Sequence, residues 1–159
     1  MSLFTPSSAA VNGAPFTLGI VAARYNEALA DGLLENVLAG LAAAGVKEKN
    51  VTVLRVPGSH EVPWAAQALA ARRGTHCVIG LGVLIAGSTN HHEMVGQSVS
   101  HALQQVALAT DTPVINGVIV ADNLKQAKDR CTGPINRGAE FAAAALEMAA
   151  LRRTLGEKS

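Results

Sequence analysis

Short apolar runs and amphipathic stretches alternate along most of the chain. Four runs have the length and the β-branched content of strands, at 17–22, Val51–Val56, Cys77–Ile85 and 114–120. Apolar residues recur every three or four positions between and after them, which predicts helices over 27–44, 62–72, 91–108, 123–130 and 136–153. This order, with short connections, predicts a three-layer α/β sandwich around a parallel four-stranded sheet.

Local signals support several of these elements. Pro63 suits the first turn of the helix over 62–72, where its missing N–H costs nothing. Asn123 is a residue type that caps helix starts. The run Cys77–Ile85 is apolar throughout, as expected of a strand covered on both faces.

The last predicted helix, over 136–153, is apolar nearly all the way round. Phe141, Leu146, Met148 and Leu151 are expected on its core side, and alanines fill much of the remaining surface. A helix of this kind is usually buried on more than one side. In a chain this short, we expect the second side to contact another subunit.

The chain is expected to form one domain, over residues 16–159, preceded by a flexible arm over 1–15 that is small, polar and punctuated by Pro and Gly. The first residues lack a basic region followed by an apolar stretch, and no run has the length of a membrane span. We therefore expect a cytoplasmic protein.

The composition points to an assembly. Of the 159 residues 49% are hydrophobic, only 16% are charged, and 29 are alanine, so much of the surface is expected to be hidden by neighbours. Thirteen basic and 12 acidic residues give no general attraction to nucleic acid or to anionic membranes. Two cysteines do not make a disulfide framework, and Cys77, in its apolar run, is expected to be a buried free thiol.

Polar loops follow the predicted strands, and in open parallel sheets ligands bind beyond these carboxyl ends. The loop after the first strand holds Tyr25, the only tyrosine, and Arg130 lies near the loop after the fourth. The second and third loops hold histidine, hydroxyl and carboxylate side chains: Ser59, His60, Glu61, Ser88, Thr89, His91 and His92. This convergence predicts a ligand site at that edge of the sheet.

The segment Gly87-Ser88-Thr89, at the start of a helix, resembles an anion site, with free N–H groups and two hydroxyls. It also fits an ordinary capped helix start. His91 follows it, where the positive end of the helix favours the neutral imidazole that a general base needs. It could equally cap or solvate the loop.

A metal site is a weaker interpretation. His91, His92 and Glu93 are consecutive, and consecutive helical residues diverge by about 100°, so they cannot face one ion together. A zinc site would need His60 from another loop. We expect no metal, and a metal-dependent hydrolase built on these histidines is the alternative to that expectation.

Six blocks of the sequence, in order and at the ends of predicted strands and helices, resemble the lumazine synthases of riboflavin biosynthesis. The resemblance extends from about Thr17 to Leu151. The blocks are Ala-Arg-Tyr-Asn at 23–26, Val-Pro-Gly-Ser-His-Glu-Val-Pro at 56–63, Gly-Val-Leu-Ile-Ala-Gly-Ser-Thr-Asn-His at 82–91, Pro-Val-Ile-Asn-Gly-Val at 113–118, Gln-Ala-Lys-Asp-Arg at 126–130 and Asn-Arg-Gly-Ala-Glu at 136–140.

The resemblance implies a flavodoxin-like fold that forms homopentamers, in some members twelve of them in an icosahedral shell, with each active site between neighbouring subunits. It implies the condensation of 5-amino-6-(D-ribitylamino)uracil with 3,4-dihydroxy-2-butanone 4-phosphate. The products are 6,7-dimethyl-8-ribityllumazine, phosphate and water, and no cofactor is needed. Riboflavin synthase is an expected partner.

The resemblance also implies roles for individual residues. His91 would transfer protons and Arg130 would clamp the phosphate, which Ser88 and Thr89 cradle. Tyr25 would stack on the pyrimidine ring. Ser59, His60 and Glu61 would hold the ribityl chain and the edge of the ring, and the strand end Val83, Leu84 and Ile85 would offer backbone groups to the uracil. Asn116 would lie near the substrate, and Arg137 stands in place of the usual lysine and keeps its charge.

The departures from the family pattern fall on the lining of the site. His60 and His92 stand where aromatic residues are common, as does Met94; Asn116 replaces Phe or Leu, and Ala86 replaces Lys or Arg. Because imidazole titrates near neutral pH, we expect the affinity for the uracil substrate to change between pH 5.5 and 8. The alternative is a non-catalytic homologue of the same fold that binds a flavin or forms a compartment.

Overall fold

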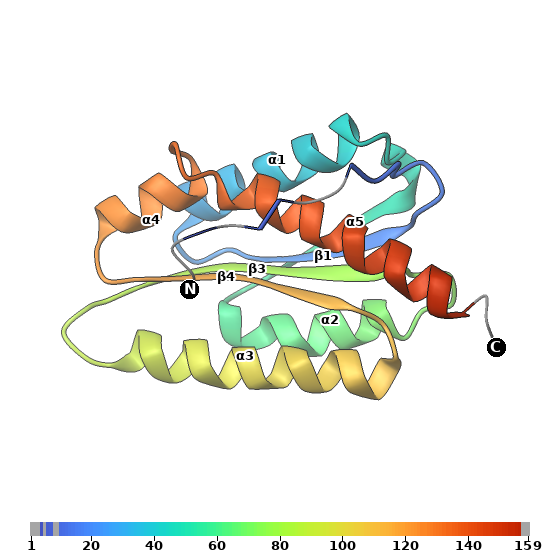
Figure 1. Cartoon of the computed structure of the whole chain (residues 1–159). Helices are drawn as coiled ribbons and strands as arrows, with labels where there is room; N and C mark the ends of the chain where they lie inside the picture. The colour runs from blue at the N-terminus through green and yellow to red at the C-terminus, as the bar shows by residue number, and fades with distance from the viewer. Residues whose placement is uncertain (1–3, 5, 8–9, 157–159) are drawn as a thin grey trace.

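The computed structural model describes residues 4, 6–7 and 10–156. Strands and helices alternate through this part of the chain (Figure 1). The strands are β1 (Leu18–Ala23), β2 (Val51–Val56), β3 (Cys77–Ile85) and β4 (Val114–Ala121). The helices are α1 (Glu27–Ala43), α2 (Val62–Ala70), α3 (His91–Thr110), α4 (Leu124–Cys131) and α5 (Arg137–Gly156), with 3-10 turns η1 (Glu48–Asn50) and η2 (Ser59–Glu61).

The four strands form one parallel sheet, as predicted, and their order in the sheet is β2-β1-β3-β4. The chain runs from β1 outward to β2 and then returns to place β3 on the other side of β1. This is the flavodoxin-like order, in which the direction of winding changes between β1 and β3. Ligands of such sheets bind at the carboxyl ends of the strands beside that point.

Helices cover both faces of the sheet, which gives the three-layer α/β/α sandwich. In Figure 1, α1, α4 and α5 lie above the sheet, and α2 and α3 lie below it. Each layer encloses its own apolar core, and the central strands β1 and β3 contribute buried side chains to both. The prediction that Cys77–Ile85 is covered on both faces is confirmed, since its first seven residues are buried.

The helices bury the stripes that their periodicity predicts. On α1 the buried residues include Leu29, Leu33, Val37 and Leu41, and on α3 they are Val95, Val99, Leu103 and Val106. Pro63 stands in the first turn of α2, and the side-chain oxygen of Asn123 accepts a hydrogen bond from the N–H of Gln126 at 2.9 Å, so both local signals are confirmed.

The prediction for the core side of the last helix is half wrong. Phe141 and Leu146 are buried, but Met148 and Leu151 are 38% and 46% exposed. The buried stripe continues instead through Ala142, Ala145 and Ala149. The physical reason is close packing of α5 on α1: a Cβ on Gly40 of α1 would lie only 2.8 Å from the Cβ of Ala142, so small residues must face this contact.

The strand β4 is less buried than its apolar sequence suggests. Asn116 and Val120 are exposed, because β4 lies at the edge of the sheet. The side-chain oxygen of Asn116 accepts a hydrogen bond from the N–H of Val118 at 3.1 Å.

The predicted flexible arm stays a prediction, and residues 1–3, 5 and 8–9 of it lie outside the described residues. Within the rest, Gly13 is buried, and its N–H donates to the carbonyl of Ala44 at 2.8 Å. No helix in the described part of the chain is long and apolar enough to cross a membrane.

Candidate active site

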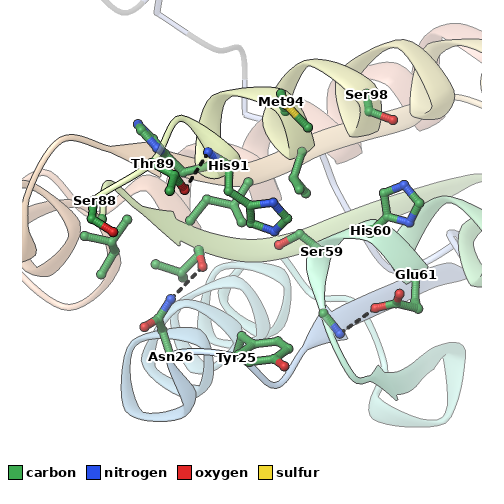
Figure 2. A pocket seen from close by; sticks show the side chains of 17 residues that line it. Tyr25, Asn26, Ser59, His60, Glu61, Ser88, Thr89, His91, Met94 and Ser98 are labelled. Atoms are coloured by element: carbon green, nitrogen blue, oxygen red, sulfur yellow. Dashed lines mark hydrogen bonds between the residues drawn. The ribbon is translucent and has the colours of Figure 1, made fainter.

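A cavity of about 900 Å³ opens at the carboxyl ends of β1 and β3 and against the start of α3. Ten of the predicted site residues line it (Figure 2): Tyr25, Ser59, His60, Glu61, Val83, Leu84, Ile85, Ser88, Thr89 and His91. The pocket therefore lies where the change of winding between β1 and β3 places it.

The loop after β1 supplies Tyr25 and Asn26. The N–H of Tyr25 donates to the carbonyl of Pro57 at 3.2 Å, and its side chain is 71% exposed. Asn26 has a left-handed backbone, with φ 56° and ψ 52°, and its Nδ2 donates to the carbonyl of Val83 at 2.8 Å. This bond joins the loop after β1 to the end of β3.

The loop after β2 forms η2, which carries Ser59, His60 and Glu61. One carboxylate oxygen of Glu61 accepts the N–H of Gly58 at 2.9 Å, which fixes the side chain at the mouth of the pocket. Ser59 is only 4% exposed, and its hydroxyl has no hydrogen-bond partner among the described residues. It lies directly over Gly82, where any Cβ would overlap the Ser59 Oγ.

The third side of the pocket is the turn from β3 into α3. Ser88 and Thr89 are exposed there, and the Thr89 hydroxyl accepts the N–H of His91 at 3.4 Å. His91 is the first residue of α3, and Figure 2 shows its ring pointing into the pocket. The N-terminal end of a long helix, two hydroxyls and an imidazole thus line one side of the same cavity, which is chemistry suited to an anion and a proton transfer.

Sequence reasoning missed several lining residues. Asn26, Gly58, Val95 and Ser98 line the cavity without having been assigned a role there, and Met94, expected on the lining, is confirmed there. Met94 and Ser98 follow His91 at helical spacing, so the periodicity of α3 would have placed them on its pocket face. His92 also lines it, and its Nδ1 is buried without a hydrogen-bond partner in the described part of the chain.

Three predicted site residues lie outside the cavity of this chain. Asn116 is exposed on the edge strand β4, and Arg130 lies on α4, where it donates to the carbonyl of Gln126 at 3.1 Å. Arg137 begins α5, pairs with Glu140 at 2.6 Å and lies 5.3 Å over the ring of Phe141. The structure groups ten predicted residues in one pocket and leaves these three elsewhere.

The cysteines take no part in this pocket. Burial raises the pKa of the Cys77 thiol to about 12 and that of Cys131 to about 11. Both are free and buried, as expected for Cys77, so neither thiol supplies a thiolate nucleophile near neutral pH. Among residues 10–156 and the few described before them, no group of three or more His, Cys, Asp or Glu side chains is placed to hold a metal ion.

The similarity to known proteins covers nearly the whole chain. Residues 15–153 match the family described as 6,7-dimethyl-8-ribityllumazine synthase. Proteins with that name are 43% identical in Aquifex aeolicus over 138 residues, 86% of this chain and 90% of that one. In Pyrococcus furiosus the identity is 40% over 147 residues, 92% of each chain, and in Thermobifida fusca it is 43% over 148 residues, 91% and 85%.

Proposed function

The chain belongs to the 6,7-dimethyl-8-ribityllumazine synthase family, and from this membership we propose that the strand-end pocket is its substrate site. The protein is a transferase of riboflavin biosynthesis that acts on small molecules. It condenses 5-amino-6-(D-ribitylamino)uracil with 3,4-dihydroxy-2-butanone 4-phosphate to 6,7-dimethyl-8-ribityllumazine. The observation that carries the proposal is the gathering of ten predicted residues around one cavity.

The reaction asks the site to hold two reactants, to bind a phosphate and to move protons. An amine of the uracil attacks the ketone, water and phosphate leave, and the new ring closes. Holding both reactants in one orientation supplies much of the rate, because a bimolecular step becomes effectively intramolecular. No group beyond acids, bases and hydrogen-bond donors is needed for these steps.

We propose that the uracil lies between the loop after β1 and the end of β3. Tyr25, exposed at the mouth, offers a ring for offset stacking on the pyrimidine. The backbone of Val83, Leu84 and Ile85 runs along the same pocket and offers hydrogen-bonding groups. Ser59, His60 and Glu61 would take the ribityl chain, and the buried Ser59 hydroxyl, which has no partner among the described residues, is free to bind a ligand hydroxyl.

We propose that the phosphate of the butanone binds at the start of α3. Ser88 and Thr89 provide hydroxyls there, and the first N–H groups of the 20-residue helix favour an anion. His91, at the same helix start, would pass protons between the amine, the leaving groups and water.

The residues outside the pocket support a site shared between subunits. We propose that Arg130 of a neighbouring chain closes the phosphate site, and that Asn116 and Arg137 of that chain reach the uracil. In this chain all three lie on β4, α4 and α5, elements that contact one another.

The proposed assembly is a homopentamer, alone or in a shell of twelve, with riboflavin synthase as a further partner. The proposed location is the cytoplasm, where buried thiols stay reduced.

The test mixes the two substrates and follows the absorbance and fluorescence of the lumazine. His91→Ala and Arg130→Ala should each abolish most of the product, while Lys128→Ala, on the exposed face of the same helix as Arg130, should not. Full activity of both His91→Ala and Arg130→Ala would overturn the site.

Mixed assemblies test the sharing of the site. If one chain supplies His91 and its neighbour Arg130, unfolding and reassembling the two inactive variants together should restore roughly a quarter of the wild-type activity. In a randomly mixed ring, that is the share of interfaces with both residues intact. Absence of any recovery, with intact mixed oligomers, would place both residues in one chain's site.

A further inference from the structure

Asn26 has a backbone conformation that few residues other than glycine adopt. Its φ of 56° and ψ of 52° lie in the left-handed region, at the N-cap of α1. Asparagine tolerates this region better than most residues because its short side chain can hydrogen-bond locally. The conformation turns the chain from β1 into α1 directly after Tyr25.

The Asn26 side chain does not cap its own helix but reaches the end of the neighbouring strand β3. Its Nδ2 donates to the carbonyl of Val83 at 2.8 Å, in a partly buried contact between residues 57 positions apart (Figure 2). The register of β1 with β3 ends at the pair of Ala22 and Leu81, so the bond extends the tie between these strands into the pocket.

The Tyr25 ring depends on such a tie, because it is not held by burial. A Cβ on Gly58 would lie 3.1 Å from Cδ2 of the ring and 3.4 Å from Cε2, so the ring rests against the Gly58 backbone. Its other surroundings are open, since the side chain is 71% exposed. The backbone on both sides of Tyr25 therefore decides where the ring lies.

We propose that Asn26 is a positioning residue for the condensation. Through its bond to Val83 it holds the loop after β1 to β3, and so keeps the Tyr25 ring against Gly58 and at a fixed distance from the strand end that faces the pyrimidine. The inference rests on the proposed function, because it takes Tyr25 as the residue that stacks on the uracil.

Two variants remove the bond and leave the backbone conformation accessible. Glycine adopts the left-handed region freely, and aspartate tolerates it while lacking the donor. Asn26→Gly and Asn26→Asp should each raise KM for the ribitylaminouracil about three- to tenfold, the worth of one hydrogen bond. The KM for the butanone phosphate should stay near that of the wild type, and the midpoint of unfolding should fall only slightly, by the worth of the one lost hydrogen bond.

The matched control is Asp111→Gly, at the C-terminal end of α3. Asp111 has a left-handed φ of 51° and lies outside the substrate pocket, so this variant should change neither KM. If both Asn26 variants raise the two KM values together and unfold earlier than the control, Asn26 has only a general structural role and the inference is wrong.

A double-mutant cycle with Tyr25→Ala separates this inference from the proposed function. Tyr25→Ala alone should raise KM for the uracil substrate, and Asn26→Gly should add little to it, because there is no ring left to position. Effects that multiply would overturn the positioning role and leave the proposed site standing. A KM that Tyr25→Ala leaves unchanged would overturn the stacking role of Tyr25, and the inference with it.

Discussion

Ser59 is, at the scale of one residue, a buried polar group for which the protein itself supplies no hydrogen-bond partner among the described residues. A buried polar group without a partner destabilises the protein, and the cost is recovered when a ligand or water supplies the missing bond.

Removing this hydroxyl should therefore separate stability from binding. We expect Ser59→Ala to leave the free energy of unfolding unchanged or slightly higher, and to raise KM for the ribitylaminouracil about three- to tenfold. Ser100→Ala, at an exposed position of α3, is the control and should change neither quantity. If Ser59→Ala is as stable as the wild type and its KM for the ribitylaminouracil is unchanged, the hydroxyl does not contact the substrate.

Gly82, which packs against Ser59, and Gly87, which lines the pocket, make a matched pair for stability. A Cβ on Gly82 would overlap Oγ of Ser59 and lie 3.2 Å from its Cβ, whereas a Cβ on Gly87 would meet no atom within 4 Å. Gly82→Ala should lower the free energy of unfolding by about 1–3 kcal/mol through overpacking. Gly87→Ala should be neutral or slightly stabilising. Chemical denaturation of both variants measures this, and equal stabilities would contradict the packing around Ser59.

His76 makes the stability of the fold depend on pH. Its Nδ1 accepts the N–H of Thr17 at 2.9 Å, and its ring meets Phe16 edge-on with centroids 5.3 Å apart. Burial, helped by the nearby Arg152 and Arg153, lowers the pKa of His76 below its ordinary value. The unfolded chain therefore binds a proton at a higher pH than the folded chain, so stability is lost as the pH falls below about 6.5.

The measurement is the free energy of unfolding at pH 7.5 and pH 5 for the wild type and for His76→Asn. Asparagine places an acceptor near the position of Nδ1 but does not titrate. The His76→Asn variant should therefore lose less stability in acid than the wild type. His101→Gln, at an exposed position of α3, should keep the wild-type pH dependence. Identical acid sensitivity of wild type and His76→Asn would exclude this origin.

At the scale of elements, α4 has eight residues and depends on its cap. The side-chain oxygen of Asn123 accepts the N–H of Gln126, and the helix carries Arg130 two turns further on. Asn123→Ala should cost about 1 kcal/mol of stability, whereas Asn123→Ser should keep most of it, since serine also caps. If Arg130 binds phosphate, Asn123→Ala should also raise KM for the butanone phosphate, which steady-state kinetics of both variants would show.

The pairing of α1 with α5 explains why the chain uses alanine so heavily. Gly40 and Ala142 meet so closely that a larger side chain would push the helices apart. Small residues therefore set the distance between the two helices, and Met148 and Leu151 of α5 turn outward, while Phe141 and Leu146 stay buried. Met148 and Leu151 line a second cavity of about 650 Å³ at the opposite end of the sheet from the pocket.

At the scale of the whole molecule, large apolar side chains remain at the surface of the single chain. Trp64, Leu108 and Leu155 are 79%, 82% and 62% exposed. Together with the low share of charged residues, this supports an assembly that covers part of the surface.

Light scattering should accordingly find a particle of at least five times the 16.3 kDa chain. The result should hold at micromolar concentration and in moderate salt, because apolar contacts carry the assembly. A stable monomer with full synthase activity would contradict the shared site.

The amino-acid sequence alone determined the layers of the fold and the place of the pocket. Apolar periodicity located each helix and strand to within about three residues, because burying a face dictates which positions are apolar. The polar loops after β1, β2 and β3 predicted seven of the residues that line the cavity, because the ends of parallel strands meet at one edge. The resemblance to the lumazine synthases added Val83, Leu84 and Ile85 at the end of β3.

Only the tertiary structure decided which side chains touch. No local pattern says that Asn26 reaches Val83, that Ser59 lies on Gly82, or that α5 turns Met148 outward. These contacts depend on the distances and angles between elements far apart in the chain, which packing fixes and periodicity does not. For the same reason the sequence grouped Asn116, Arg130 and Arg137 with the pocket, and only the folded chain placed them outside it.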